Sequence, residues 1–128
     1  MRATNWTRHR TLIAAAVVVV ALLAIWFIAG RGSGAEAARW RLDPSFTPAP
    51  ESTSIPLLVQ EAACASGRSA TGRIELSVRY SDTAVTIDIR VQPLDGDQTC
   101  QAIETPLSVQ LREPLGQRAL VDANARTP

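Results

Sequence analysis

The segment Arg73–Val91, RIELSVRYSDTAVTIDIRV, decides the fold of this chain. Apolar and polar residues alternate in it twice, once on each side of residues 81–84. The two apolar series are Ile74, Leu76, Val78 and Tyr80, followed by Val85, Ile87, Ile89 and Val91. A period of two over consecutive segments is typical of β-strands. We therefore predict strands at 73–80 and 85–91 that form a hairpin.

Two registers of this hairpin keep the apolar faces together, and charge selects between them. In one register Val78 pairs with Val85, and two like-charged pairs face each other. In the other, Val78 pairs with Ile87, and Glu75 faces Arg90. Like charges directly opposite each other cost up to about 1 kcal/mol per pair. We therefore predict the second register.

Alternating patterns on both sides of the hairpin predict further short strands. These lie at 55–60, 106–112 and 118–122. Residues 113–116, EPLG, suit a type I turn that joins the last two strands, and residues 60–65 can form one helical turn. The sequence thus predicts a small all-β domain over 55–122, an antiparallel meander or a sandwich, followed by a C-terminal tail at 123–128.

A long apolar stretch near the N-terminus predicts a membrane span. Leu12–Ala29, LIAAAVVVVALLAIWFIA, contains no charged or strongly polar residue. As a helix it covers roughly 27 Å, close to the ~30 Å hydrocarbon core of a bilayer. We predict a single transmembrane helix over 12–30 in the cell (plasma) membrane. The arginines of a short tail at 1–11, with no acidic residue before Glu36, put the N-terminus in the cytoplasm and the rest of the chain outside.

A cleaved signal peptide is the alternative interpretation of the apolar stretch. Ala35–Ala37, AEA, offers a small-x-small cleavage site. The apolar stretch is nevertheless longer than the roughly 7–15 residues of a signal peptide, and a wide gap separates it from that site. A buried helix of a soluble protein would need a larger domain around it. A retained membrane anchor explains the pattern better.

Residues 31–54 are predicted to be a spacer between membrane and domain. The stretch is rich in glycine, serine and proline, which favour flexible or extended backbone. Arg39–Leu42 within it alternates arginine with Trp40 and Leu42, so it can also pair as an edge strand or dock Trp40 on the domain. The sequence leaves ordered and disordered states open there.

Cys64 and Cys100 both fall in the portion that we expect outside the cytoplasm. In that compartment two cysteines form a disulfide by default. Closing a loop of about 36 residues stabilises a domain by roughly 4 kcal/mol in the chain-entropy model. We predict this bridge as the main staple of a small core.

We predict no catalytic, cofactor-binding or metal site. The one histidine, His9, lies in the cytoplasmic tail, so it cannot serve a nucleophile outside. Asp95–Asp97 lacks the oxygen ligands of a calcium loop and is interpreted as a polar turn. Residues 65–73 offer backbone amides and Arg68 to an anion, but they follow no strand–helix phosphate pattern. The 13 basic residues, all arginine, against 12 acidic ones argue against nucleic acid as a partner.

Three sequence elements carry a resemblance to other proteins. They are CASG at Cys64–Gly67, TC at Thr99–Cys100 and EPLGxRxLxD at Glu113–Asp122. In these the chain resembles a group of exported or membrane-anchored proteins of actinobacteria. The resemblance implies a small envelope domain with paired cysteines, and it brings no catalytic residue with it.

These observations predict a single-pass membrane protein that displays a non-catalytic binding or accessory domain at the cell envelope. Its expected partners are the membrane and an unidentified envelope or membrane protein. Two other functions remain open: an extracytoplasmic hydrolase that uses carboxylates, and a sensor subunit of a membrane complex. The sensor would need a membrane partner, because the tail at 1–11 is too short to carry an output domain.

Overall fold

The computed structural model describes residues 34–125. The predicted tail at 1–11 and transmembrane helix at 12–30 lie outside the described residues. The described strands are β1 (Glu36–Leu42), β2 (Ser54–Gln60), β3 (Ile74–Tyr80), β4 (Ala84–Val91), β5 (Thr105–Gln110) and β6 (Ala119–Asp122). In this part of the chain no helix has the length and apolar character needed to cross a bilayer, and residues 60–65 form no helical turn.

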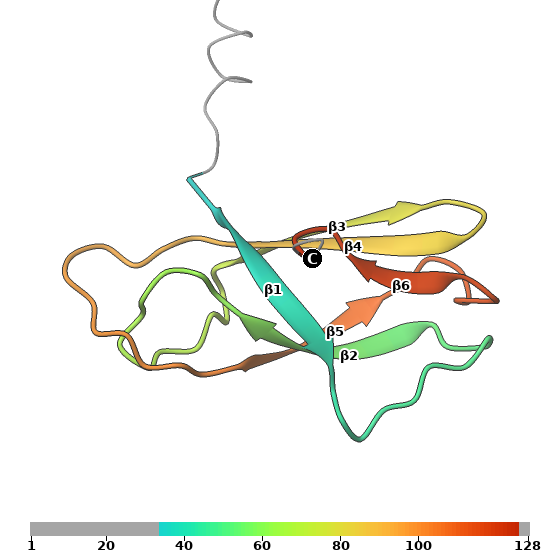
Figure 1. Cartoon of the computed structure of the whole chain (residues 1–128), viewed down its shortest axis with the longest axis horizontal. Coiled ribbons are helices and arrows are strands. Elements are labelled where there is room, and N and C mark those ends of the chain that lie inside the picture. The colour runs from blue at the N-terminus through green and yellow to red at the C-terminus, as the bar shows by residue number, and fades with distance from the viewer. Residues whose placement is uncertain (1–33, 126–128) are drawn as a thin grey trace, which may run out of the picture. The chain divides into compact units, whose positions relative to one another are not determined.

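The strands form a curled sheet in the order β3-β4-β1-β2-β5, and β6 pairs with β4. Figure 1 shows β1 running diagonally between β3, β4 and β6 above and β2 and β5 below. All ladders are antiparallel except the one between β4 and β6. The predicted all-β class is confirmed, but the strand order is not that of a meander, because β1 is inserted between β4 and β2.

The hairpin of β3 and β4 has the predicted register. Val78 lies opposite Ile87, and Glu75 lies opposite Arg90. The Ser81 amide closes the loop by donating to the Ala84 carbonyl oxygen at 2.9 Å. Charge complementarity across the ladder was therefore a sufficient guide to this register.

β1 lies inside the stretch 31–54 that the sequence analysis interprets as a spacer, and Glu36–Leu42 within it is a strand of the domain. It is an interior strand and not an edge strand, because Glu36–Ala38 pair with β4 and Arg39–Leu42 pair with β2. Ala38 is buried in the core, and the indole N–H of Trp40 donates to the Ile87 carbonyl oxygen at 3.2 Å. These contacts make β1 part of the domain.

The last two predicted strands form as β5 and β6, but they do not pair with each other. β5 pairs with β2, and β6 pairs in parallel with β4. The connecting loop is held against the segment before β2: the Leu115 amide donates to the Ser52 carbonyl oxygen at 2.9 Å and the Gly116 amide to the Pro50 carbonyl oxygen at 2.8 Å. This anchored loop carries the chain from one part of the sheet to the other.

The core lies inside the curl of the sheet, between β2, β4 and β5. Its largest fully buried side chains are Ile55, Leu57, Val59, Val85, Ile87, Ile89 and Val109. They occupy alternate positions of these strands, as a period of two requires. Trp40, Tyr80 and Leu120 pack against this core from its margins.

Candidate functional site

Two loops at one end of the domain are joined by the predicted disulfide. Cys64 and Cys100 are bonded, with their Cα atoms 4.5 Å apart and a sequence separation of 36. The bridge connects residues 61–73, which follow β2, to residues 92–104, which follow β4. We call these two segments the stapled loops.

Arg73 is a further connection between the stapled loops. Its guanidinium donates to both carboxylate oxygens of Glu61, at 2.9 and 2.8 Å. It also donates to the Gln92 carbonyl oxygen at 2.7 Å and to the Ser69 carbonyl oxygen at 3.1 Å. The hydrogen bonds with Glu61 raise the pKa of Arg73 above its ordinary value. The sequence pattern placed Arg73 at the start of a strand and carried no signal for this role.

Backbone amides of the first stapled loop are used within the protein. The Ala70 amide donates to the hydroxyl oxygen of Thr105, a buried residue, at 2.8 Å, and the Ser66 amide donates to the Thr99 carbonyl oxygen at 2.8 Å. The amides of Arg68 and Arg73 close local turns. These four amides are therefore not available to an anion at 65–73.

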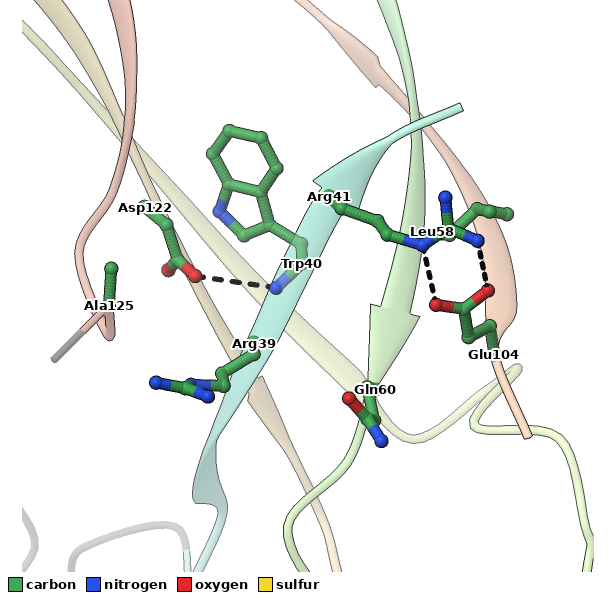
Figure 2. Close-up of a pocket in the computed structure, with 8 residues that line it drawn as sticks. All are labelled: Arg39, Trp40, Arg41, Leu58, Gln60, Glu104, Asp122 and Ala125. Carbon is green, nitrogen blue, oxygen red and sulfur yellow. Dashed lines mark hydrogen bonds and ion pairs between the residues drawn. The ribbon is translucent and has the colours of Figure 1, made fainter. Parts of the chain in front are cut away.

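A hollow of about 270 Å³ lies along β1, and Figure 2 shows the residues around it. We call it the β1 hollow. It is lined by Arg39, Trp40, Arg41, Leu58, Gln60, Glu104, Asp122 and Ala125. Small-molecule sites usually enclose about 300–1,000 Å³. The β1 hollow lies just below that range.

One side of the β1 hollow is formed by an exposed ion pair. Arg41 donates to both carboxylate oxygens of Glu104, at 2.7 and 2.6 Å (Figure 2). These hydrogen bonds hold the pKa of Glu104 below its ordinary value. Glu104 is therefore ionised at neutral pH and is not suited to act as a general acid.

The other side of the β1 hollow is set by Asp122 at the end of β6. Its carboxylate accepts the backbone N–H of Trp40 at 3.4 Å and that of Asn124 at 2.9 Å. In Figure 2, Asp122 and Glu104 lie on opposite sides of β1. The two carboxylates of the hollow are thus engaged separately and do not converge on one point.

Arg39 and Gln60 are polar residues of the β1 hollow whose side chains have no hydrogen-bond partner among residues 34–125. They lie directly opposite each other in the β1–β2 ladder, and both are exposed. Among the described residues Arg39 forms no ion pair. A guanidinium beside a carboxamide is a suitable donor pair for a carboxylate or a carbonyl oxygen. The sequence signal for this pair is limited to the alternation around Trp40.

Metal binding has no candidate in the described part of the chain. No group of three or more histidine, cysteine, aspartate or glutamate side chains comes together within residues 34–125. Asp95 and Gly96 form a bend, with Gly96 in the left-handed region at φ 76°. No protein-family model, curated protein or solved structure matches this chain.

Proposed function

We propose that this chain is a single-pass membrane protein that displays its β domain outside the cytoplasm as a binding module for an envelope partner. The domain itself is not catalytic in this proposal. The N-terminal arginines and the apolar stretch Leu12–Ala29 are the basis for the topology. The surface around the β1 hollow is the basis for the binding role.

The disulfide Cys64–Cys100 is the observation that carries the proposal. Disulfides persist in oxidising compartments and are rare in the cytoplasm. A structural bridge in the domain therefore agrees with a topology in which the portion after the apolar stretch is exported. Two independent features, the charge distribution around the apolar stretch and the paired cysteines, support the same side of the membrane.

The β1 hollow supports recognition of a partner protein. Arg39 and Gln60 offer donors that no other residue of 34–125 uses, on an exposed sheet surface, whereas Arg41 and Glu104 neutralise each other beside them. Such an arrangement fits an acidic side chain or an extended backbone of a partner. Two arginines and two carboxylates line the hollow, so it carries no net charge, which disfavours strongly anionic polymers.

Topology is tested with added cysteines, since the described part of the chain has no free thiol of its own. We expect Ser108→Cys to react with a membrane-impermeant maleimide in intact cells. Asn5→Cys, in the predicted cytoplasmic tail, should react only after the membrane is permeabilised. Labelling of Asn5→Cys in intact cells, or of Ser108→Cys only after permeabilisation, would contradict the proposed orientation.

The binding role is tested with a photo-crosslinking amino acid in the full-length chain in its own cells. Placed at Gln60, it should form one discrete adduct, and Arg39→Glu should abolish that adduct because it removes the donor beside Gln60. The matched control is the same probe at Ser108, which is exposed on β5. The same adducts from the probes at Gln60 and Ser108, or no adduct from the probe at Gln60, would contradict a binding role for this surface.

A further inference from the structure

The outer edge of β3 is an uncovered sheet edge. Within residues 34–125, β3 pairs with β4 on one side and has no strand on the other. Figure 1 shows it as the outermost strand of its part of the sheet. Leu76, at the middle of this strand, is 44% exposed, although its ladder partner Ile89 is fully buried. An edge of this kind is a template for pairing with another strand.

The hydrogen bonds of the hairpin determine which backbone groups this edge presents. The Ser81 amide donates to the Ala84 carbonyl oxygen, and the Gln92 amide donates to the Arg73 carbonyl oxygen. In an antiparallel ladder the bonded pairs alternate, so the odd-numbered residues of β3 face β4. The N–H and C=O groups of Ile74, Leu76, Val78 and Tyr80 therefore point outward at the edge.

The charges on the outer face of β3 are arranged symmetrically. Glu75 and Arg79 lie two residues to either side of Ser77, and all three are exposed. If two copies pair antiparallel with Ser77 opposite Ser77, each Glu75 faces Arg79 of the other copy. The same register places Leu76 opposite Val78. The backbone groups of both residues point outward, so they can hydrogen-bond to each other. Hydrogen bonding and charge thus select one register.

Other registers with the same hydrogen bonding are less favourable. Centring the pair on Glu75 sets two glutamates opposite each other, and centring it on Arg79 sets two arginines opposite each other. Centring it on Leu76 brings Arg79 opposite Arg73 of the other copy. Like charges directly opposite are destabilising in a sheet. The register centred on Ser77 is the one that gives two complementary pairs.

The side chains around Glu75 carry both signs of charge. Within its own chain, Glu75 lies opposite Arg90 and accepts a hydrogen bond from the Gln92 side chain at 2.7 Å. Arg90 is also 3.9 Å from Asp88. A shallow hollow of about 240 Å³ lies at this place, lined by Glu75, Leu76, Ser77, Asp88 and Arg90. In a register centred on Ser77, Arg79 of a second copy would join this group of charges.

The other uncovered edge, that of β5, is less suited to pairing. The Leu111 amide donates to the Thr53 carbonyl oxygen, so the odd-numbered residues of this strand face β2. The outward positions then include Pro106, which has no N–H to donate. Proline at an outward position is a known protection of sheet edges. β3 contains no such residue.

We propose that two copies of this chain associate through β3, antiparallel and centred on Ser77, to form one continuous sheet across the two domains. The symmetry is that of a two-fold dimer, the commonest arrangement of homo-oligomers. This inference is independent of the β1 hollow, which lies on another part of the sheet. It identifies the occupant of the edge as a second copy because the charge pattern of β3 is complementary to itself.

The register is tested by cysteine cross-linking of the full-length protein in detergent micelles. Opposed residues of a non-hydrogen-bonded pair have Cα atoms about 4.5 Å apart, which is within disulfide range. We expect Ser77→Cys to give a covalent dimer under mild oxidation. Ser108→Cys on the β5 edge is the matched control and should stay monomeric. Equal rates of cross-linking for the two variants would overturn the proposal.

Charge reversal tests the same interface without relying on one variant. Arg79→Glu and Glu75→Arg should each weaken self-association about ten-fold, because each creates two like-charged pairs. An equimolar mixture of the two variants should associate again, since every pair between the two chains is then complementary. Analytical ultracentrifugation in detergent measures all three samples. A wild-type chain that remains monomeric, or a mixture that does not associate, would overturn the proposed register.

Discussion

Two bidentate arginine–glutamate pairs in this domain have the same chemistry and different surroundings. In the stapled loops, the side chains of Arg73 and Glu61 are only 15% and 11% exposed. On the β1 hollow, those of Arg41 and Glu104 are 53% and 36% exposed. The first pair also binds two backbone carbonyl groups. Burial and the number of joined segments, and not the ion pair alone, determine how much such a pair stabilises the fold.

The largest effect is expected from removing the disulfide that makes the stapled loops one unit. Cys64→Ser/Cys100→Ser should lower the free energy of unfolding by about 4 kcal/mol, because the denatured chain gains the entropy of an open loop. Urea denaturation followed by circular dichroism measures the change. Wild-type protein under strong reductant is the control and should unfold at the same urea concentration. An unchanged midpoint would mean that other contacts hold the loops.

The buried pair is tested next. Arg73→Met leaves the Glu61 carboxylate buried without its partner, and we expect a loss of about 2 kcal/mol in the free energy of unfolding. The double variant Arg73→Met/Glu61→Leu should lose less than the single variant, because it leaves no unpaired charge. The same denaturation experiment compares them. A double variant less stable than the single one would refute this explanation.

Thr105 allows an uncharged hydrogen bond of the stapled loops to be tested. Thr105→Val keeps the shape of this buried side chain but removes the oxygen that accepts the Ala70 amide proton. We expect a loss of about 1–2 kcal/mol, typical of a buried donor left without an acceptor. Thr86→Val on β4, where the side chain is half-buried, is the control and should change stability less. Equal effects would show that the Ala70 contact is not the cause.

The exposed pair is expected to have the smallest effect, and that effect should depend on pH. Arg41 lowers the pKa of Glu104 from its ordinary value of 4.5, so the pair stabilises the folded state above that value. This contribution is lost as the pH falls through the folded-state pKa. Arg41→Met should therefore change stability less than Thr105→Val at pH 7, and not at all at a pH below both pKa values. A difference that persists in acid, measured by urea titrations at each pH, would point to packing of the arginine stem.

The strand pattern could be predicted from the sequence, whereas the way in which the strands join could not. Period-two alternation located β2 to β6 to within a few residues, and charge selected the Val78–Ile87 register. β1 was harder to predict because glycine and proline on both sides of it suggested a linker. Its role depends on contacts with Ile87 and Val59, which are distant in the chain. Alternation within a strand does not identify such partners.

The candidate site was predictable only in part for the same reason. The Cys64–Cys100 bridge followed from the number of cysteines and the expected compartment. The β1 hollow combines residues from β1, β2, β6 and the end of a stapled loop, so no local motif marks it. Arg73 likewise acts on Glu61 and Gln92 through the fold, although the pattern showed it only as a polar strand residue.

The position of β1 has a mechanical consequence. β1 is the first strand of the described chain, and it is bonded along its length to β4 and then to β2. A pulling force that reaches residue 34 from the N-terminal side would load both ladders in shear, where several hydrogen bonds must break together. A domain attached through this strand would resist extraction or stretching, because β1 is hydrogen-bonded to β4 and to β2.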